Sequence, residues 1–176
     1  MSQYPDLEAS EPFAVETLRS MIDNVYTKAA TTDRTLTAVV ADDGDLAGIP
    51  LGVGIWMIRF KIMWSVASTT PDFKTQWSFT GTWTTPSRMV TGPAITNVAV
   101  PTAVTPHKLS VVSAGTDSTY GGGGGSVSQY YITEEDAYDV SVTAAGNLAL
   151  AWSQNTSSAD ITRIRGGSVC VTKQVG

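Results

Sequence analysis

In the stretch from Gly54 to Val66, GIWMIRFKIMWSV, every second residue from Trp56 onward is large and apolar. Because successive side chains of a β-strand point to opposite faces, a period of two predicts one long strand with one buried face. The buried face is predicted to carry the large apolar residues Trp56, Ile58, Phe60, Ile62, Trp64 and Val66.

The opposite face of this strand mixes apolar residues with two cations. Arg59 and Lys61 lie there beside Met57, Met63 and Ile55. Two cations rarely lie unpaired in a protein core, so this face is predicted to be partly exposed or covered by another subunit. We therefore take Met57, Arg59 and Met63 as candidate assembly contacts.

Short apolar segments separated by turn residues continue through the rest of the chain. Charged residues make up only 15% of the sequence, below the roughly 25% of an average soluble protein. This pattern predicts an all-β fold over residues 33–176, an antiparallel two-sheet sandwich, jelly-roll-like, of about eight strands. The further segments that we expect to form strands include DFKTQWSF, KLSVVSAG, SVSQYYIT, AYDVSVTAAG, NLALAWSQ and GSVCVTKQV.

The N-terminal region has a different period. In residues 10–29, Val15, Leu18, Ile22 and Val25 recur at three- and four-residue steps, which predicts one short amphipathic helix. Together with the extended stretch before it, this helix would form an N-terminal arm over residues 1–32. We expect the apolar stripe to dock on neighbouring subunits or to self-associate about a threefold axis.

Charge and hydropathy narrow the choice of partners. The formal net charge is −5, and there is no run of Lys or Arg, so nucleic acid is not expected as a partner. The longest apolar run is interrupted by Arg59 and Lys61, so no membrane span is expected. The polar, acidic start of the chain gives no secretory signal, and folding in a cytoplasm is expected.

Two acidic clusters are candidate sites. Asp42, Asp43 and Asp45 resemble a fragment of a calcium loop, but the ligating Glu downstream is missing. A tight turn with solvated acids is expected there, with a weak surface calcium site as the alternative.

The second cluster consists of Glu134, Glu135 and Asp136. Neighbouring residues of a strand point to opposite faces, so Glu134 and Glu135 are poorly placed to flank one sugar as a glycosidase requires. A solvated turn between two strands is predicted instead.

Other reactive residues are few. His107 is the only histidine and Cys170 the only cysteine; we expect neither a zinc site nor an activated nucleophile, and Cys170 is predicted to be a small buried residue. The run YGGGGGSV at residues 120–127 lacks the lysine of a phosphate-binding loop and is predicted to be a mobile loop tip. The sequence therefore predicts no enzyme activity and no cofactor or metal.

Trp83 differs from the other tryptophans because it follows no alternating apolar pattern. It lies in a segment rich in Thr and Pro, which is expected to form loops and one edge strand. Core packing, a subunit contact and stacking on a glycan all remain open for this side chain.

Three stretches together carry a family resemblance. They are YPDLEASEPFAVETLRSMIDNVYTKAATTDRTLT, PDFKTQWSFTG and GNLALAWSQNTSSADITRIRGGSVCVTKQV. The combination resembles a family of small virion structural proteins, labelled minor tail or virion-associated proteins, of tailed phages that infect actinobacteria. Near its end the chain departs from the family pattern, with Cys170 and Lys173 where a bulky apolar residue and Arg are usual.

The resemblance implies a non-enzymatic component of the virion, assembled in the host cytoplasm. Its expected partners are copies of itself, with a trimer favoured, and other tail or capsid proteins. A tail position is favoured, and a capsid decoration or head-fibre protein is the alternative. A further alternative, from a different class of function, is a carbohydrate-binding module that recognises host surface glycan through Trp83 and the glycine loop.

Overall fold

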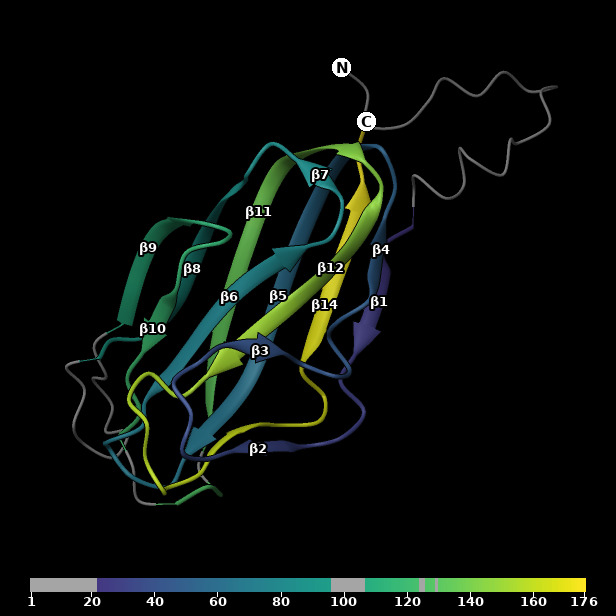
Figure 1. Ribbon diagram of the computed structural model, residues 1–176. Helices are drawn as coiled ribbons and strands as arrows, with labels where there is room; N and C mark the ends of the chain where they lie inside the picture. Colours follow the sequence, from purple (N-terminus) through teal and green to yellow (C-terminus); the bar gives the residue numbers. More distant parts are fainter. Residues whose placement is uncertain (1–21, 96–106, 124–125, 129) are drawn as a thin grey trace, which may run out of the picture.

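The computed structural model describes residues 22–95, 107–123, 126–128 and 130–176, as two antiparallel β-sheets packed face to face (Figure 1). The large sheet has nine strands and the small sheet has five. Within the described residues there is no helix. The predicted sandwich is therefore confirmed. Its strand count exceeds the predicted eight because several strands have only two or three residues.

The large sheet is built around the long strand β5 (Gly54–Val66). The strands on its main path lie in the order β1 (Asn24–Thr27), β14 (Val169–Gln174), β5, β11 (Tyr131–Ala144), β8 (Ser87–Pro93) and β9 (His107–Ser113). Three short strands extend it: β13 (Thr162–Ile164) pairs with β5, β2 (Thr32–Arg34) with β13, and β7 (Thr82–Trp83) with β11.

The small sheet covers the inner face of the large one. Its order is β10 (Ser118–Tyr120), β6 (Phe73–Phe79), β12 (Gly146–Ser153) and β3 (Ala41–Asp42), with β4 (Ile49–Leu51) also paired to β12. In Figure 1, β6 and β12 cross in front of β5, β11 and β14.

The core between the sheets follows the alternation in the sequence. All six apolar residues predicted to point inward from β5 are buried. Across the core, Trp64 stacks on Phe73 of the small sheet with ring centroids 4.7 Å apart, and Phe60 lies 5.1 Å from Trp77. Burial of these large apolar side chains is the main favourable contribution to folding.

The predicted helix over residues 10–29 is wrong in the part that the structure describes. Residues 24–27 form β1, which pairs antiparallel with β14, placing Val25 opposite Val171 and Tyr26 opposite Cys170. The reason is tertiary: an edge of the sheet offers partners for the backbone, and Tyr26 packs against the core. Val15 and Leu18, the other half of the predicted stripe, lie outside the described residues.

Two further predictions need correction. The segment predicted to form loops and one edge strand contains two strands: β7, for which the described residues give β11 as partner, and β8, an interior strand between β11 and β9. Pro93 is tolerated in β8 because it occupies the last position. The acidic residues 134–136 do not form a turn. They lie within one continuous strand, β11, paired with β5 along most of its length.

Candidate functional site

The face of the large sheet that points away from the small sheet has an ordered pattern of side chains, and we call it the outer face. Six strands contribute one residue each to two neighbouring rows across it. In the order β1, β14, β5, β11, β8, β9, the first row is Val25, Val171, Arg59, Asp136, Met89 and Val111. The second row is Thr27, Val169, Lys61, Glu134, Thr91 and Leu109.

The centre of the outer face carries two ion pairs between β5 and β11. Arg59 Nε lies 2.5 Å from Asp136 Oδ1, and Lys61 Nζ lies 3.4 Å from Glu134 Oε1. Arg59 also donates to the hydroxyl of Tyr138 at 3.1 Å. The hydrogen bond to Asp136 raises the pKa of Arg59 above its ordinary value. The two cations that the sequence left without a partner are thus paired on the same face.

Apolar side chains flank these ion pairs on both sides. On the β9 side Leu109 and Val111 are 72% and 68% exposed, and on the β1 side Val25 is 60% exposed. By contrast, the corresponding face of β6 in the small sheet carries Lys74, Gln76 and Ser78. Exposed apolar residues that line up across one sheet are typical of a surface that another molecule covers.

The predicted assembly residues gather on this face as far as the structure describes them. Met57, Arg59 and Met63 alternate with the buried residues of β5, and Val25 lies in β1 at the sheet edge. Ile22 is exposed just before β1. The apolar residues of β8 and β9 were not among the predicted contacts: the segment of β8 was predicted as loops and one edge strand, and the segment of β9 as a strand without an assigned exposed face.

A second cluster of charges lies inside the sandwich, where the sequence predicted none. Glu135, expected in a solvated turn, is fully buried and forms an ion pair with the buried Arg88 of β8. Its carboxylate also accepts hydrogen bonds from Thr75, from Trp77 Nε1 at 2.6 Å and from the hydroxyl of Tyr120 at 2.7 Å. Burial, followed by the nearby carboxylate, raises the pKa of Tyr120.

This arrangement explains why Glu135 is tolerated in the core. Four donors from both sheets satisfy the carboxylate, and a buried charge is stable only when it is paired and hydrogen-bonded in this way. Through these donors the Glu135 carboxylate links the two sheets.

The acidic turn at residues 42–45 is likewise built differently from the prediction. Lys28, which follows β1, is 1% exposed, and its ammonium group lies 2.8 Å from Asp43 Oδ1 and 3.3 Å from Asp45 Oδ2. Asp43 is fully buried and also accepts from Trp152 Nε1 at 3.0 Å. The expected turn of solvated acids is therefore wrong for Asp43.

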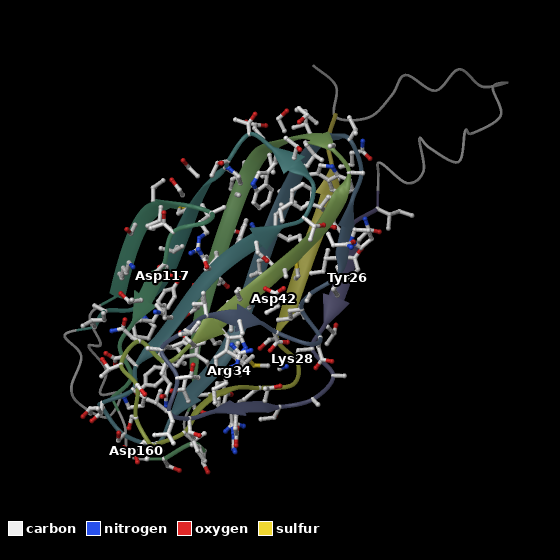
Figure 2. The ribbon with its side chains drawn as sticks, in the orientation of Figure 1. Tyr26, Lys28, Arg34, Asp42, Asp117 and Asp160 are labelled. Carbon is white, nitrogen blue, oxygen red and sulfur yellow. The ribbon has the colours of Figure 1, made fainter. Side chains whose placement is uncertain are left out.

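The surroundings of this turn already contain cations. Figure 2 labels Lys28 and Arg34 on the same side of the molecule as Asp42, near β3. Arg34 donates to the backbone carbonyl of Asp42 at 2.9 Å, and its guanidinium lies 4.1 Å from the ring centroid of Trp152. Among the described residues, no group of three or more His, Cys, Asp or Glu side chains is arranged to hold a metal ion.

The glycine run lies between the strands β10 and β11, in agreement with the predicted loop. Its first half is buried, which differs from the expected mobile tip. Gly121, Gly122 and Gly123 are buried. The amide of Gly122 donates to Asp72 Oδ1 at 2.9 Å, and that of Gly123 donates to the hydroxyl of Tyr131 at 2.6 Å. A Cβ atom on Gly122 would run into the side chain of Val66, so close packing requires glycine here.

The remaining sequence candidates do not converge on one place. Cys170 is buried on β14, as predicted, and burial raises the pKa of its thiol. The backbone of His107 pairs with Pro93 at the far end of the β8–β9 ladder. Trp83 is half-buried on β7, and its ring stacks on Phe79 with centroids 4.7 Å apart, so core packing accounts for one face of the indole.

The protein is therefore an all-β sandwich. One face of its large sheet carries exposed apolar residues around two ion pairs that form within the chain. No protein-family model and no curated protein matches the sequence. Within the described residues no helix is long and apolar enough to cross a membrane.

Proposed function

We propose that this protein is a non-enzymatic structural subunit of a phage particle, associated with the tail, which joins its neighbours through the outer face of the large sheet. The observation that carries the proposal is that face: two rows of side chains in register across six strands, with ion pairs at the centre and exposed apolar residues on both flanks. Such a surface is built to be covered by a protein.

The interior supports the same proposal. Glu135 and Asp43 are both fully buried, and their carboxylates accept hydrogen bonds from side chains of the protein. Their role is to link the two sheets and to fix a turn, which suits a rigid building block. The chemistry of an active site would instead need acids or nucleophiles that face a cleft.

The phage context comes from the resemblance carried by the three sequence stretches quoted above. A jelly-roll-like sandwich belongs to this proposal and has support in the strand connections. The chain passes repeatedly between the sheets, from β5 to β6, back to β8 and β9, and again from β11 to β12 to β13. Residues 1–32 remain the proposed anchoring arm, although β1 already belongs to the sandwich.

The direct test is to locate the protein on intact particles. Gold-labelled antibodies raised against the purified protein should mark the tails of the phage that encodes this chain, in electron micrographs of purified virions. Label confined to capsids would overturn the tail position in favour of a capsid decoration or head-fibre protein. Absence of the protein from purified virions by mass spectrometry would overturn the structural role.

A pair of variants links this function to the outer face. The double variant Leu109→Lys, Val111→Lys places two cations on its apolar flank and should prevent incorporation into particles, because burying unpaired charges at an interface is unfavourable. The control Ser78→Lys adds a cation to the exposed side of the small sheet and should be incorporated normally. Equal incorporation of both variants would contradict assembly through this face.

A further inference from the structure

In the two central rows of the outer face the charges are segregated by strand; a further ion pair, Lys173 with Asp23, lies one row away at the β14 side. On this face β5 carries the cations Arg59 and Lys61, and its neighbour β11 carries the carboxylates of Glu134 and Asp136. Apolar residues lie beyond both strands: Val169, Val171 and Val25 beside β5, and Met89, Val111 and Leu109 on β8 and β9 beyond β11. Read across the strands, these two rows pass from a mainly apolar flank through cations and carboxylates to a second mainly apolar flank, with Thr27 and Thr91 as the polar members of the flanks.

This order of charges and apolar flanks makes the outer face complementary to a second copy of itself. When this order is read from the opposite side, starting at β9 instead of β1, the cationic and anionic strands exchange places. The apolar flanks still lie at the two ends. The surface that best complements the outer face is therefore the same face turned over. The chain itself carries that surface, and a two-fold interface uses the same patch on both subunits.

We propose that the outer face is covered by a second copy of this chain, in a dimer whose two-fold axis runs along the strands between β5 and β11. This inference rests on the proposed function, since it names the partner of the assembly surface. The two-fold rotation places β5 of each protomer over β11 of the other protomer. Arg59 and Lys61 then face carboxylates in both places, while the apolar flank of β1 and β14 meets that of β8 and β9.

The other two-fold arrangement of the same faces is electrostatically unfavourable. An axis running across the strands would lay β5 over β5 and β11 over β11, so cations would face cations and carboxylates would face carboxylates. Both axes keep the strands of the two sheets nearly aligned, as stacked sheets usually are to within about 30°, so only the charges distinguish them. Charge thus selects one orientation out of two.

A charge-exchanged variant tests the orientation without breaking the fold. Arg59→Asp, Lys61→Glu, Glu134→Lys and Asp136→Arg together exchange the two charged stripes, so each chain keeps its internal ion pairs and its net charge. We expect the wild type and this variant each to form dimers, seen by sedimentation velocity. When both are co-expressed with different tags, native mass spectrometry should find mixed dimers at about one tenth or less of the share given by random pairing, because like charges would then face each other.

The other outcomes overturn the inference in different ways. Mixed dimers in excess of random pairing would show that the axis runs across the strands. Mixed dimers at the random share, both at low salt and in 1 M salt, would show that the outer face is not the interface; a real charge effect should appear at low salt and fade at high salt. Monomers of the wild type at micromolar concentration would exclude the dimer.

These failures can be told apart from failure of the proposed function. The antibody test on virions reports the particle role and does not depend on the pairing of copies. Monomers in solution that still label tails would overturn only the two-fold dimer. Dimers that behave as expected but are absent from purified virions would overturn only the phage role.

Discussion

Arg88 and Glu135 form an ion pair at the centre of the sandwich, where neither side chain is exposed to solvent. The two residues come from adjacent strands of the large sheet, β8 and β11, while Trp77 and Tyr120, which also donate to Glu135, come from the small sheet. The pair and its donors therefore connect both layers. Such a network is stable only as long as all of its partners are present.

The first prediction is that Glu135→Ala strongly destabilises the protein. The substitution leaves the Arg88 guanidinium buried without a counter-ion, which should lower the free energy of unfolding by about 3–5 kcal/mol in urea titrations. Glu134→Ala is the matched control on the neighbouring position of β11, since Glu134 is about half exposed and its ion pair with Lys61 lies at the surface. The Glu134→Ala variant should lose no more than about 1 kcal/mol of unfolding free energy. Similar losses for both variants would contradict the buried network.

This network also marks the limit of what could be predicted from the sequence. The alternation of β11 places residue 135 on the same inward face as Tyr131, Thr133 and Ala137. Three consecutive acids nevertheless favoured a turn, because an unpaired carboxylate is too costly to bury. The partner that makes burial acceptable is Arg88, 47 residues away, and no local pattern reveals it.

A distant partner also explains why the predicted helix is wrong at residues 24–27. The spacing of Ile22 and Val25 fits a helix, but Val25, Tyr26 and Thr27 are β-branched or aromatic residues, which fit a strand equally well. Pairing with β14 decides for the strand, because it satisfies the backbone and brings Tyr26 onto the core. By contrast, the buried face of β5 could be predicted in full, since a large apolar residue recurs at every second position from Trp56 to Val66.

The second prediction concerns the turn that holds Lys28. Asp43→Asn removes the buried counter-ion of Lys28 and should cost about 3 kcal/mol or more of folding free energy, measured by urea unfolding. Asp42→Asn, in the same turn, should cost less than about 1 kcal/mol, because Asp42 is exposed. Addition of calcium should leave the unfolding midpoint of the wild type unchanged, since an ammonium group already occupies the space between Asp43 and Asp45. A midpoint that rises with calcium would refute this.

A third prediction separates a packed glycine from a free one. In Gly122→Ala the new methyl group meets Val66 inside the core, and overpacking of this kind usually costs about 1–3 kcal/mol. A Cβ atom on Gly115, which lies in a turn, has nothing within 4 Å. Gly115→Ala should therefore change the denaturant midpoint little. If the two variants had equal midpoints, the first half of the glycine run would not be packed as described.

The fourth prediction uses the only thiol of the chain as a probe of the sheet edge. Cys170 is fully buried opposite Tyr26 in the β1–β14 pair, and burial raises the pKa of its thiol well above the ordinary range. Alkylation requires the thiolate, so raising the pH from 7 to about 9, which would ionise a free cysteine, should produce almost no reaction with iodoacetamide in the native protein. The same protein unfolded in urea should react at the rate of a free cysteine, followed by intact-mass spectrometry. Rapid alkylation under native conditions would mean that β1 opens readily, and the N-terminal edge of the outer face would then be too unstable to serve as part of a permanent interface.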